Sequence, residues 1–135
     1  MPARAAITDP PFSSDLLSQR SRDRAIRSMR CLPFTDALYR DLQRQGLDAA
    51  NLWHNKDRYR RGNRWPRSPD ALEVDLRWLI TVGVLRREVD GQGLTSRFRL
   101  TPLGRALLDG DPDLLETPAG AGEQLRQALR RRWPL

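Results

Sequence analysis

Apolar residues in the middle of the chain recur at helical spacing between two clear boundary signals. Ser68 followed by Pro69 is typical of a helix start, because a serine hydroxyl can cap the first turn and proline lacks an N–H that would have no intrahelical partner there. Gly83 is typical of a helix end. The apolar positions on one face are Leu72, Leu76, Leu79 and Ile80. The pattern predicts a helix over residues 69–82.

Two short β-prone segments follow this helix, at residues 84–89 and 94–100, and a turn sequence rich in glycine separates them. In the second segment Ser96, Phe98 and Leu100 alternate with Thr95, Arg97 and Arg99. Because successive side chains of a strand point to opposite faces, one face can meet the core while the other presents arginines to solvent. This predicts a β-hairpin, after which Thr101 and Pro102 favour the start of a further helix.

Other helices are expected on both sides of this region. The composition predicts a helix from Ser13 or Ser14 to about Met29, and another that begins near Pro33 and Thr35 and ends at Gly46. Asp48 is the expected cap of a short helix with Ala49, Leu52 and Trp53 facing inward. Residues 123–133 form a candidate last helix with Leu125, Ala128 and Leu129 on one face. The fold class predicted is mostly α with a small β-hairpin.

The order of helix, glycine stop, hairpin with a basic outer face and helix start resembles the winged-helix (winged helix-turn-helix) fold. It is found in small bacterial regulators of the MarR, PadR and ArsR kind and in the dimerisation domains of small-molecule methyltransferases. The resemblance covers about a third of the chain. The residues that carry it are Leu76, Leu79, Gly83, Val84, Leu85, Arg87, Phe98, Leu100, Thr101, Pro102, Leu103 and Gly104. It implies a winged helix-turn-helix with extra N- and C-terminal helices, and either DNA binding or subunit pairing.

The chain divides into three parts on this interpretation. Residues 1–12 hold three prolines and no periodic apolar pattern, which predicts a flexible N-terminal arm. Residues 13–110 form the winged-helix domain with its N-terminal helix. Residues 111–135 are a linker, acidic and rich in glycine and proline, and the C-terminal helix, which the resemblance makes a candidate dimer contact.

Charge favours a polyanionic partner. The formal net charge is +7 and the isoelectric point is about 11.0, as expected of a nucleic-acid-binding protein. Every basic residue except Lys56 is arginine, and a GC-rich genome, which enriches arginine across a whole proteome, is the alternative explanation. The single cysteine, Cys31, excludes an internal disulfide. The N-terminus lacks the apolar segment of a signal peptide and no segment is long and apolar enough to cross a bilayer, so we expect a cytoplasmic protein without a membrane association.

The densest positive segment is residues 56–67, where six basic residues stand against one acidic residue. Tyr59 and Trp65 lie among these cations, and such aromatic rings can stack on bases while guanidinium groups contact phosphates. Gly62 and Asn63 make the segment a turn-bearing loop, longer than the connection in an ordinary helix-turn-helix. A solvated loop with Trp65 packed in the core is an equally weighted alternative.

The central helix is a poor candidate for reading bases. With its leucines inward, the opposite face carries Asp70, Glu73, Arg77 and Thr81, with Asp75 alongside. Three acidic residues against one arginine would repel phosphate. Val74 and Trp78 form a second apolar stripe, which either the N-terminal helix or a second subunit must cover.

The first hypothesis is therefore a small homodimeric transcriptional regulator that binds duplex DNA through the basic loop and the wing. The candidate contact residues are Lys56, Arg58, Tyr59, Arg60, Arg61, Arg64, Trp65, Arg67, Arg77, Arg86, Arg87, Arg97 and Arg99. A protein-interaction or dimerisation module without DNA binding and an RNA-binding protein are the alternatives. No nucleophile–base pair or phosphate-cradling glycine loop occurs, and His54 is the sole histidine, so we expect no enzyme, metal site or cofactor.

Overall fold

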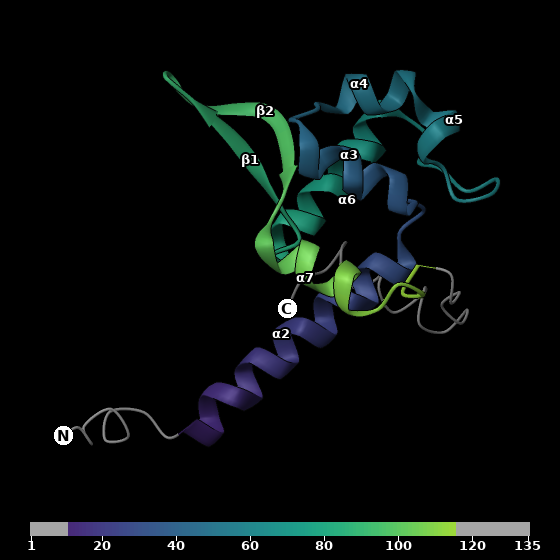
Figure 1. Cartoon of the computed structure of the whole chain (residues 1–135). Helices are drawn as coiled ribbons and strands as arrows, with labels where there is room; N and C mark the ends of the chain where they lie inside the picture. The colour runs from purple at the N-terminus through teal and green to yellow at the C-terminus, as the bar shows by residue number, and fades with distance from the viewer. Residues whose placement is uncertain (1–10, 116–135) are drawn as a thin grey trace.

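The computed structural model describes residues 11–115 of the 135 (Figure 1). Its helices are α2 (Pro11–Cys31), α3 (Asp36–Arg44), α4 (Ala49–His54), α5 (Lys56–Tyr59), α6 (Pro69–Thr81) and α7 (Pro102–Gly110). Its strands are β1 (Leu85–Asp90) and β2 (Gly93–Leu100). The prediction of a mostly α fold with a small β-hairpin is confirmed. The expected C-terminal helix at 123–133 and most of the N-terminal arm lie outside the described residues.

The predicted β-hairpin is present, with a bulge that interrupts its register. β1 and β2 pair antiparallel, with Leu85 opposite Leu100 and Asp90 opposite Gly93. A register shift between Arg87 and Val89 marks a bulge. Phe98 adds a backbone bridge to Leu47, with N···O distances of 2.8 and 3.3 Å, so the segment before α4 lies along the outer edge of β2. The hairpin projects from the helices at one end (Figure 1).

The predicted helix boundaries follow from local side-chain contacts. The Ser68 hydroxyl accepts a hydrogen bond from the Ala71 N–H, and Asp48 forms a reciprocal capping box with Asn51. Thr101 caps α7 through the Gly104 N–H. Gly83 has φ +87°, a left-handed conformation that favours glycine, which explains why α6 stops there. These four boundaries are confirmed to within a residue or two.

The core forms where α3, α4 and α6 pack against the inner face of the hairpin. Its largest fully buried side chains are Tyr39, Phe34, Phe98, Met29, Leu38, Leu42, Leu52, Leu72, Leu76 and Leu79. Leu72, Leu76 and Leu79 are the inward face predicted for α6, and Phe98 is the predicted inward residue of β2. Leu114 is also buried, so core packing continues beyond the end of α7.

The N-terminal helix covers part of the second apolar stripe of α6. The Trp78 indole N–H donates a 2.9 Å hydrogen bond to the Ser28 hydroxyl on α2. Of the two covers expected for this stripe, α2 or a second subunit, it is α2 that contacts Trp78. Val74, on the same stripe, remains 53% exposed. The N-terminal turns of α2 extend away from the other elements (Figure 1).

Three local expectations need correction. Residues 56–67 are not a loop throughout, because residues 56–59 form α5 and the turn at Gly62 follows it. Helix α2 begins at Pro11, inside the segment expected to be a flexible arm. Asp75 is buried rather than lying beside the exposed face of α6. The first two corrections concern element boundaries, whereas the third depends on packing between helices.

Within residues 11–115, no helix combines the length and the apolar character that crossing a membrane requires.

Candidate nucleic-acid interface

Two arginines of the basic segment 56–67 are used to close helix α2. The Arg61 guanidinium donates to the carbonyls of Arg30, at 2.7 Å, and Leu115, and Arg64 donates to the Cys31 carbonyl at 2.6 Å. The last carbonyls of a helix lack intrahelical partners and carry the negative end of its dipole, so cations are stabilised there. Burial lowers the pKa of Arg61. Arg61 and Arg64 therefore serve the fold.

Backbone hydrogen bonds also fix this segment to the connection between α2 and α3. The Thr35 N–H donates to the Tyr59 carbonyl at 3.1 Å, and the Arg61 N–H donates to the Pro33 carbonyl at 3.2 Å. Phe34 and Arg60 form an isolated antiparallel bridge. Backbone hydrogen bonds therefore attach the segment to the rest of the fold.

Both aromatic rings of the segment point inward. Tyr59 is 4% exposed and donates its hydroxyl to Asp41 at 2.7 Å. Trp65 packs edge-on against Phe34, with ring centroids 5.6 Å apart, and its indole N–H is buried. In this conformation Tyr59 is buried and Trp65 packs, partly buried, against the core, so neither ring is presented for stacking on bases.

Asp41 on α3 gathers a cluster that the sequence analysis missed. Arg58 donates to both carboxylate oxygens of Asp41, at 2.8 and 3.1 Å, and Arg44 pairs with the same group. The Asp41 side chain is 6% exposed, whereas those of Arg44 and Arg58 are 65% and 55% exposed. The hydrogen bond from Arg58 is the main reason why the pKa of Asp41 lies below its usual value. A buried anion thus holds two exposed guanidinium groups in fixed positions.

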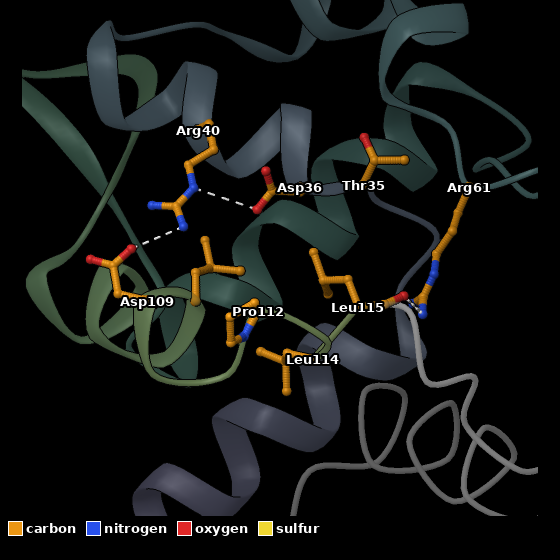
Figure 2. Close-up of a pocket in the computed structure, with 9 residues that line it drawn as sticks. Thr35, Asp36, Arg40, Arg61, Asp109, Pro112, Leu114 and Leu115 are labelled. Carbon is orange, nitrogen blue, oxygen red and sulfur yellow. Dashed lines mark hydrogen bonds and ion pairs between the residues drawn. The ribbon is translucent and has the colours of Figure 1, made fainter.

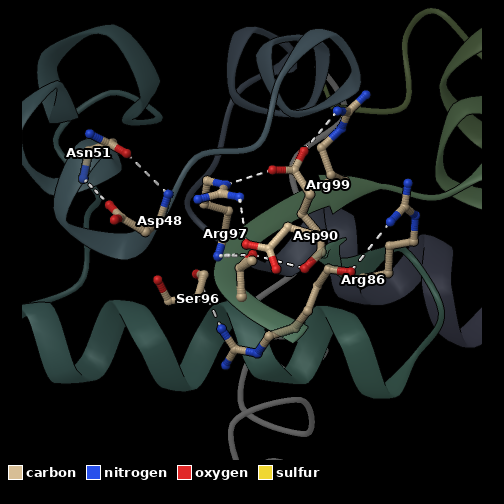
Figure 3. Close-up of polar contacts among 10 residues, drawn as sticks. Asp48, Asn51, Arg86, Asp90, Ser96, Arg97 and Arg99 are labelled. Carbon is tan, nitrogen blue, oxygen red and sulfur yellow. Dashed lines mark hydrogen bonds and ion pairs between the residues drawn. The ribbon is translucent and has the colours of Figure 1, made fainter. Parts of the chain in front are cut away.

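Glu88 on β1 organises a second pair of arginines in the same way. Arg97 donates to one carboxylate oxygen at 2.6 Å and Arg99 to the other at 3.1 Å (Figure 3). These hydrogen bonds, that of Arg97 first, lower the pKa of Glu88. A Cβ atom at Gly46 would lie 2.7 Å from the Glu88 carboxylate, so a larger residue there would require the Glu88 side chain to move. The basic outer face predicted for the hairpin is therefore present, but partly neutralised.

The two clusters meet at the last turn of α3. Arg99 also donates to the Gln43 carbonyl at 2.9 Å, next to Arg44 in the chain. We call the resulting set of four side chains, Arg44, Arg58, Arg97 and Arg99, the arginine band. Its members come from α3, α5 and β2, and only the fold brings them together. With Asp41 and Glu88 included, the band carries two net positive charges.

Two arginines beside the central helix are paired in the same way, but a second carboxylate, Asp70, lines the same hollow. Glu73 on α6 accepts from Arg77 at 3.1 Å and from Arg87 at 2.9 Å. Arg87 also lies over the Phe98 ring, 4.5 Å from its centroid. A hollow of about 610 Å³ between α6 and the hairpin is lined by Asp70 and Glu73 as well as by these two arginines. The balanced charge there gives α6 no attraction for phosphate.

The remaining predicted contact residues lie scattered on the surface. The Lys56 ammonium lies 4.7 Å from the centroid of the Trp53 ring, and Arg60 is 3.5 Å from Asp57. Arg67 and Arg86 are exposed. Of the thirteen residues predicted, the fold brings Arg58, Arg97 and Arg99 together and adds Arg44. The sequence signal that could have pointed to Arg44 is Asp41, which lies beside Leu38 and Leu42 on the apolar face of α3. A carboxylate buried at such a position requires a partner.

A second hollow, of about 590 Å³, lies between α3 and the segment after α7 (Figure 2). Arg40 reaches across it, 3.4 Å from Asp36 and 2.9 Å from Asp109. Arg61 also lines this hollow, so two arginines balance two carboxylates there. Within the described residues, no group of three His, Cys, Asp or Glu side chains could hold a metal ion.

Comparison with known proteins gives one match. The family model described as Npun_F0494-like matches residues 16–131. No curated protein and no solved structure matches the chain.

Proposed function

The chain belongs to the Npun_F0494-like family, and we propose that it is a DNA-binding protein that holds the duplex through the arginine band. The observation that carries this proposal is the pair of carboxylates, Asp41 and Glu88, each of which orients two arginines with solvent-accessible side chains. Arginines that are positioned in advance lose less conformational entropy when they bind phosphate than free side chains do. The high isoelectric point acts in the same direction.

The proposed contacts are to phosphates rather than to base edges. Phosphate contacts position a protein on DNA but carry no sequence information. On the exposed face of α6, Arg77 is paired with Glu73 and Asp70 adds a negative charge, so the face is poorly suited to reading bases. We therefore expect weak sequence preference, and a role in regulation would need an added source of specificity such as a second subunit.

The test is fluorescence anisotropy with random-sequence duplex DNA, single-stranded DNA and RNA at several salt concentrations. The diagnostic variant is the double substitution Arg44→Gln and Arg97→Gln. Each change removes one guanidinium while Asp41 keeps Arg58 and Tyr59, and Glu88 keeps Arg99. If each arginine neutralises one phosphate, the slope of log affinity against log salt should flatten by about 0.9 per arginine.

The matched control is Arg20→Gln with Arg22→Gln, which removes the same charge from exposed positions on α2. It should leave the salt slope unchanged. Absence of duplex binding at low salt, or equal slopes for both double variants, would refute the proposal. Tighter binding of single-stranded RNA than of duplex DNA would favour the RNA-binding alternative.

A second candidate function is a protein-interaction module that pairs two copies of the chain. It is favoured by three exposed apolar side chains, Val74 on α6 and the cross-strand pair Val89 and Leu94 at the hairpin tip. Leu94, at 75% exposure, lines the hollow between α6 and the hairpin. Covering this apolar tip with a partner would be favourable, because it removes apolar surface from water. If Leu94→Ser lowers the mass measured by light scattering, this face forms the contact between copies.

A further inference from the structure

A third hollow, of about 300 Å³, lies at the base of the hairpin beside the start of α7. Arg86 from β1 and Arg105 from α7 line it, together with Gln43, Thr101 and Pro102. The two arginines are 19 positions apart in the sequence, so only the fold places them on one concavity. Neither belongs to the arginine band.

This hollow differs in charge from the two described above. Each of those is lined by two arginines and two carboxylates, whereas this one is lined by two arginines and no carboxylate. Arg86 has only a long contact, 3.4 Å, to the neighbouring Arg87 carbonyl. No partner of the Arg105 side chain occurs among residues 11–115, and both arginines are exposed. Two guanidinium groups in one hollow repel each other unless an anion lies between them.

We propose that this hollow is an anion site that takes a phosphate monoester. Such a group carries a charge of about −1.5 to −2 at pH 7, which two guanidinium groups can balance. A phosphodiester has only one negative charge, and a carboxylate likewise, so both fit the pair less well. Guanidinium groups also match the oxygens of phosphate geometrically, because each can donate two parallel hydrogen bonds.

The source of the phosphate is either a free nucleotide or the 5′ end of a nucleic-acid strand. The site does not depend on the DNA-binding proposal, since its charge and shape arise from its own residues. Arg99 connects it to the arginine band through the Gln43 carbonyl, 2.9 Å away. A strand whose backbone crosses the band could therefore end in this hollow.

The experiment is a titration of the full chain with inorganic phosphate, followed by ¹H–¹⁵N NMR at constant ionic strength. Saturable shifts are expected at the side-chain Nε–H groups of Arg86 and Arg105 and at the backbone of Thr101. Arg105→Gln should weaken phosphate binding by about tenfold, the size expected for losing a charge-assisted contact. Because Arg105 is exposed, this variant should fold normally.

Arg77→Gln is the matched control, because Arg77 lines the charge-balanced hollow beside α6. It should bind phosphate as the wild type does. Equal titrations for wild type and Arg105→Gln would overturn the site, as would unsaturable shifts spread over all arginines. Both results can be read even if the protein binds no DNA, so failure of this inference is distinguishable from failure of the proposed function.

Competition experiments identify the source. Displacement of inorganic phosphate by a nucleoside 5′-monophosphate supports a free nucleotide, and displacement by only a 5′-phosphorylated oligonucleotide supports a strand end. An oligonucleotide with a 5′-hydroxyl that competes equally well would overturn the monoester assignment, because it offers only phosphodiesters.

Discussion

The indole of Trp78 and the hydroxyl of Ser28 join helices α6 and α2 across 50 positions of sequence, through a hydrogen bond of 2.9 Å. The rest of the indole packs against the core. Because Ser28 and Trp78 are both largely covered, the α2–α6 contact has a polar centre inside an apolar surround. Such a bond fixes how the two helices lie against each other.

We predict that Trp78→Ala destabilises the protein by about 3 kcal/mol, the lower end of the range for buried tryptophan, since this indole is only partly buried. Trp78→Phe keeps a ring and should cost about 1 kcal/mol through loss of the N–H donor. Urea unfolding midpoints measure both. A loss below about 1 kcal/mol for Trp78→Ala would mean that the side chain contributes little to the fold of one chain.

Arg61→Ala should destabilise the fold by about 1–3 kcal/mol, because it removes the guanidinium group that donates to the carbonyls of Arg30, Leu32 and Leu115. Arg64→Ala should act in the same direction through the Cys31 carbonyl. Arg67→Ala is the control, since Arg67 is exposed, and should change stability by less than about 0.5 kcal/mol. Thermal or urea unfolding would contradict this explanation if all three variants matched the wild type.

Asp41 should make the protein sensitive to acid. Its folded-state pKa is lowered chiefly by the Arg58 hydrogen bond, whereas the unfolded value is about 3.9. Below that pH the unfolded chain binds a proton that the folded chain does not, so stability falls as the pH drops through this window. Well above that pH Asp41 is ionised in both the folded and the unfolded chain, so its full contribution to stability is present.

The measurement is urea unfolding of wild type and Asp41→Asn at pH 7 and at about pH 3. Asp41→Asn should be less stable at pH 7 and should lose less on acidification. Equal losses in both proteins would show that other carboxylates dominate the acid response.

Subunit pairing through the expected C-terminal helix, residues 123–133, remains a prediction. A test by truncation must start at residue 116, because Leu114 is buried in the core and Leu115 accepts from Arg61. We expect light scattering at high micromolar concentration to give a dimer for the full chain and a monomer for the truncated chain. A monomeric full chain would rule out the dimer, and a truncated chain that stays dimeric would move the contact to another surface such as the hairpin tip.

Local sequence determined the boundaries of the elements. Ser68, Asp48 and Thr101 cap helices through N–H groups three residues away. Gly83 ends α6 because glycine readily adopts the positive φ that this position needs. The period of the apolar positions likewise determined which faces of α6 and β2 are buried. Such contacts span a few residues, and the same side chains would make them in any fold that contains those elements.

Only the tertiary structure decided what each arginine does. Arg61 and Arg64 belong to the same basic segment as Arg58 and Arg60, yet the carbonyls that they bind lie 29 to 54 positions away. A dense basic segment indicates charge, but whether a guanidinium group stays exposed to phosphate depends on which groups of the same chain it contacts. Arg44, Arg58, Arg97 and Arg99 form a surface because α3, α5 and β2 pack together, and Arg86 and Arg105 share a hollow for the same reason. Charge density is a property of the sequence, whereas the position of each charge depends on long-range packing.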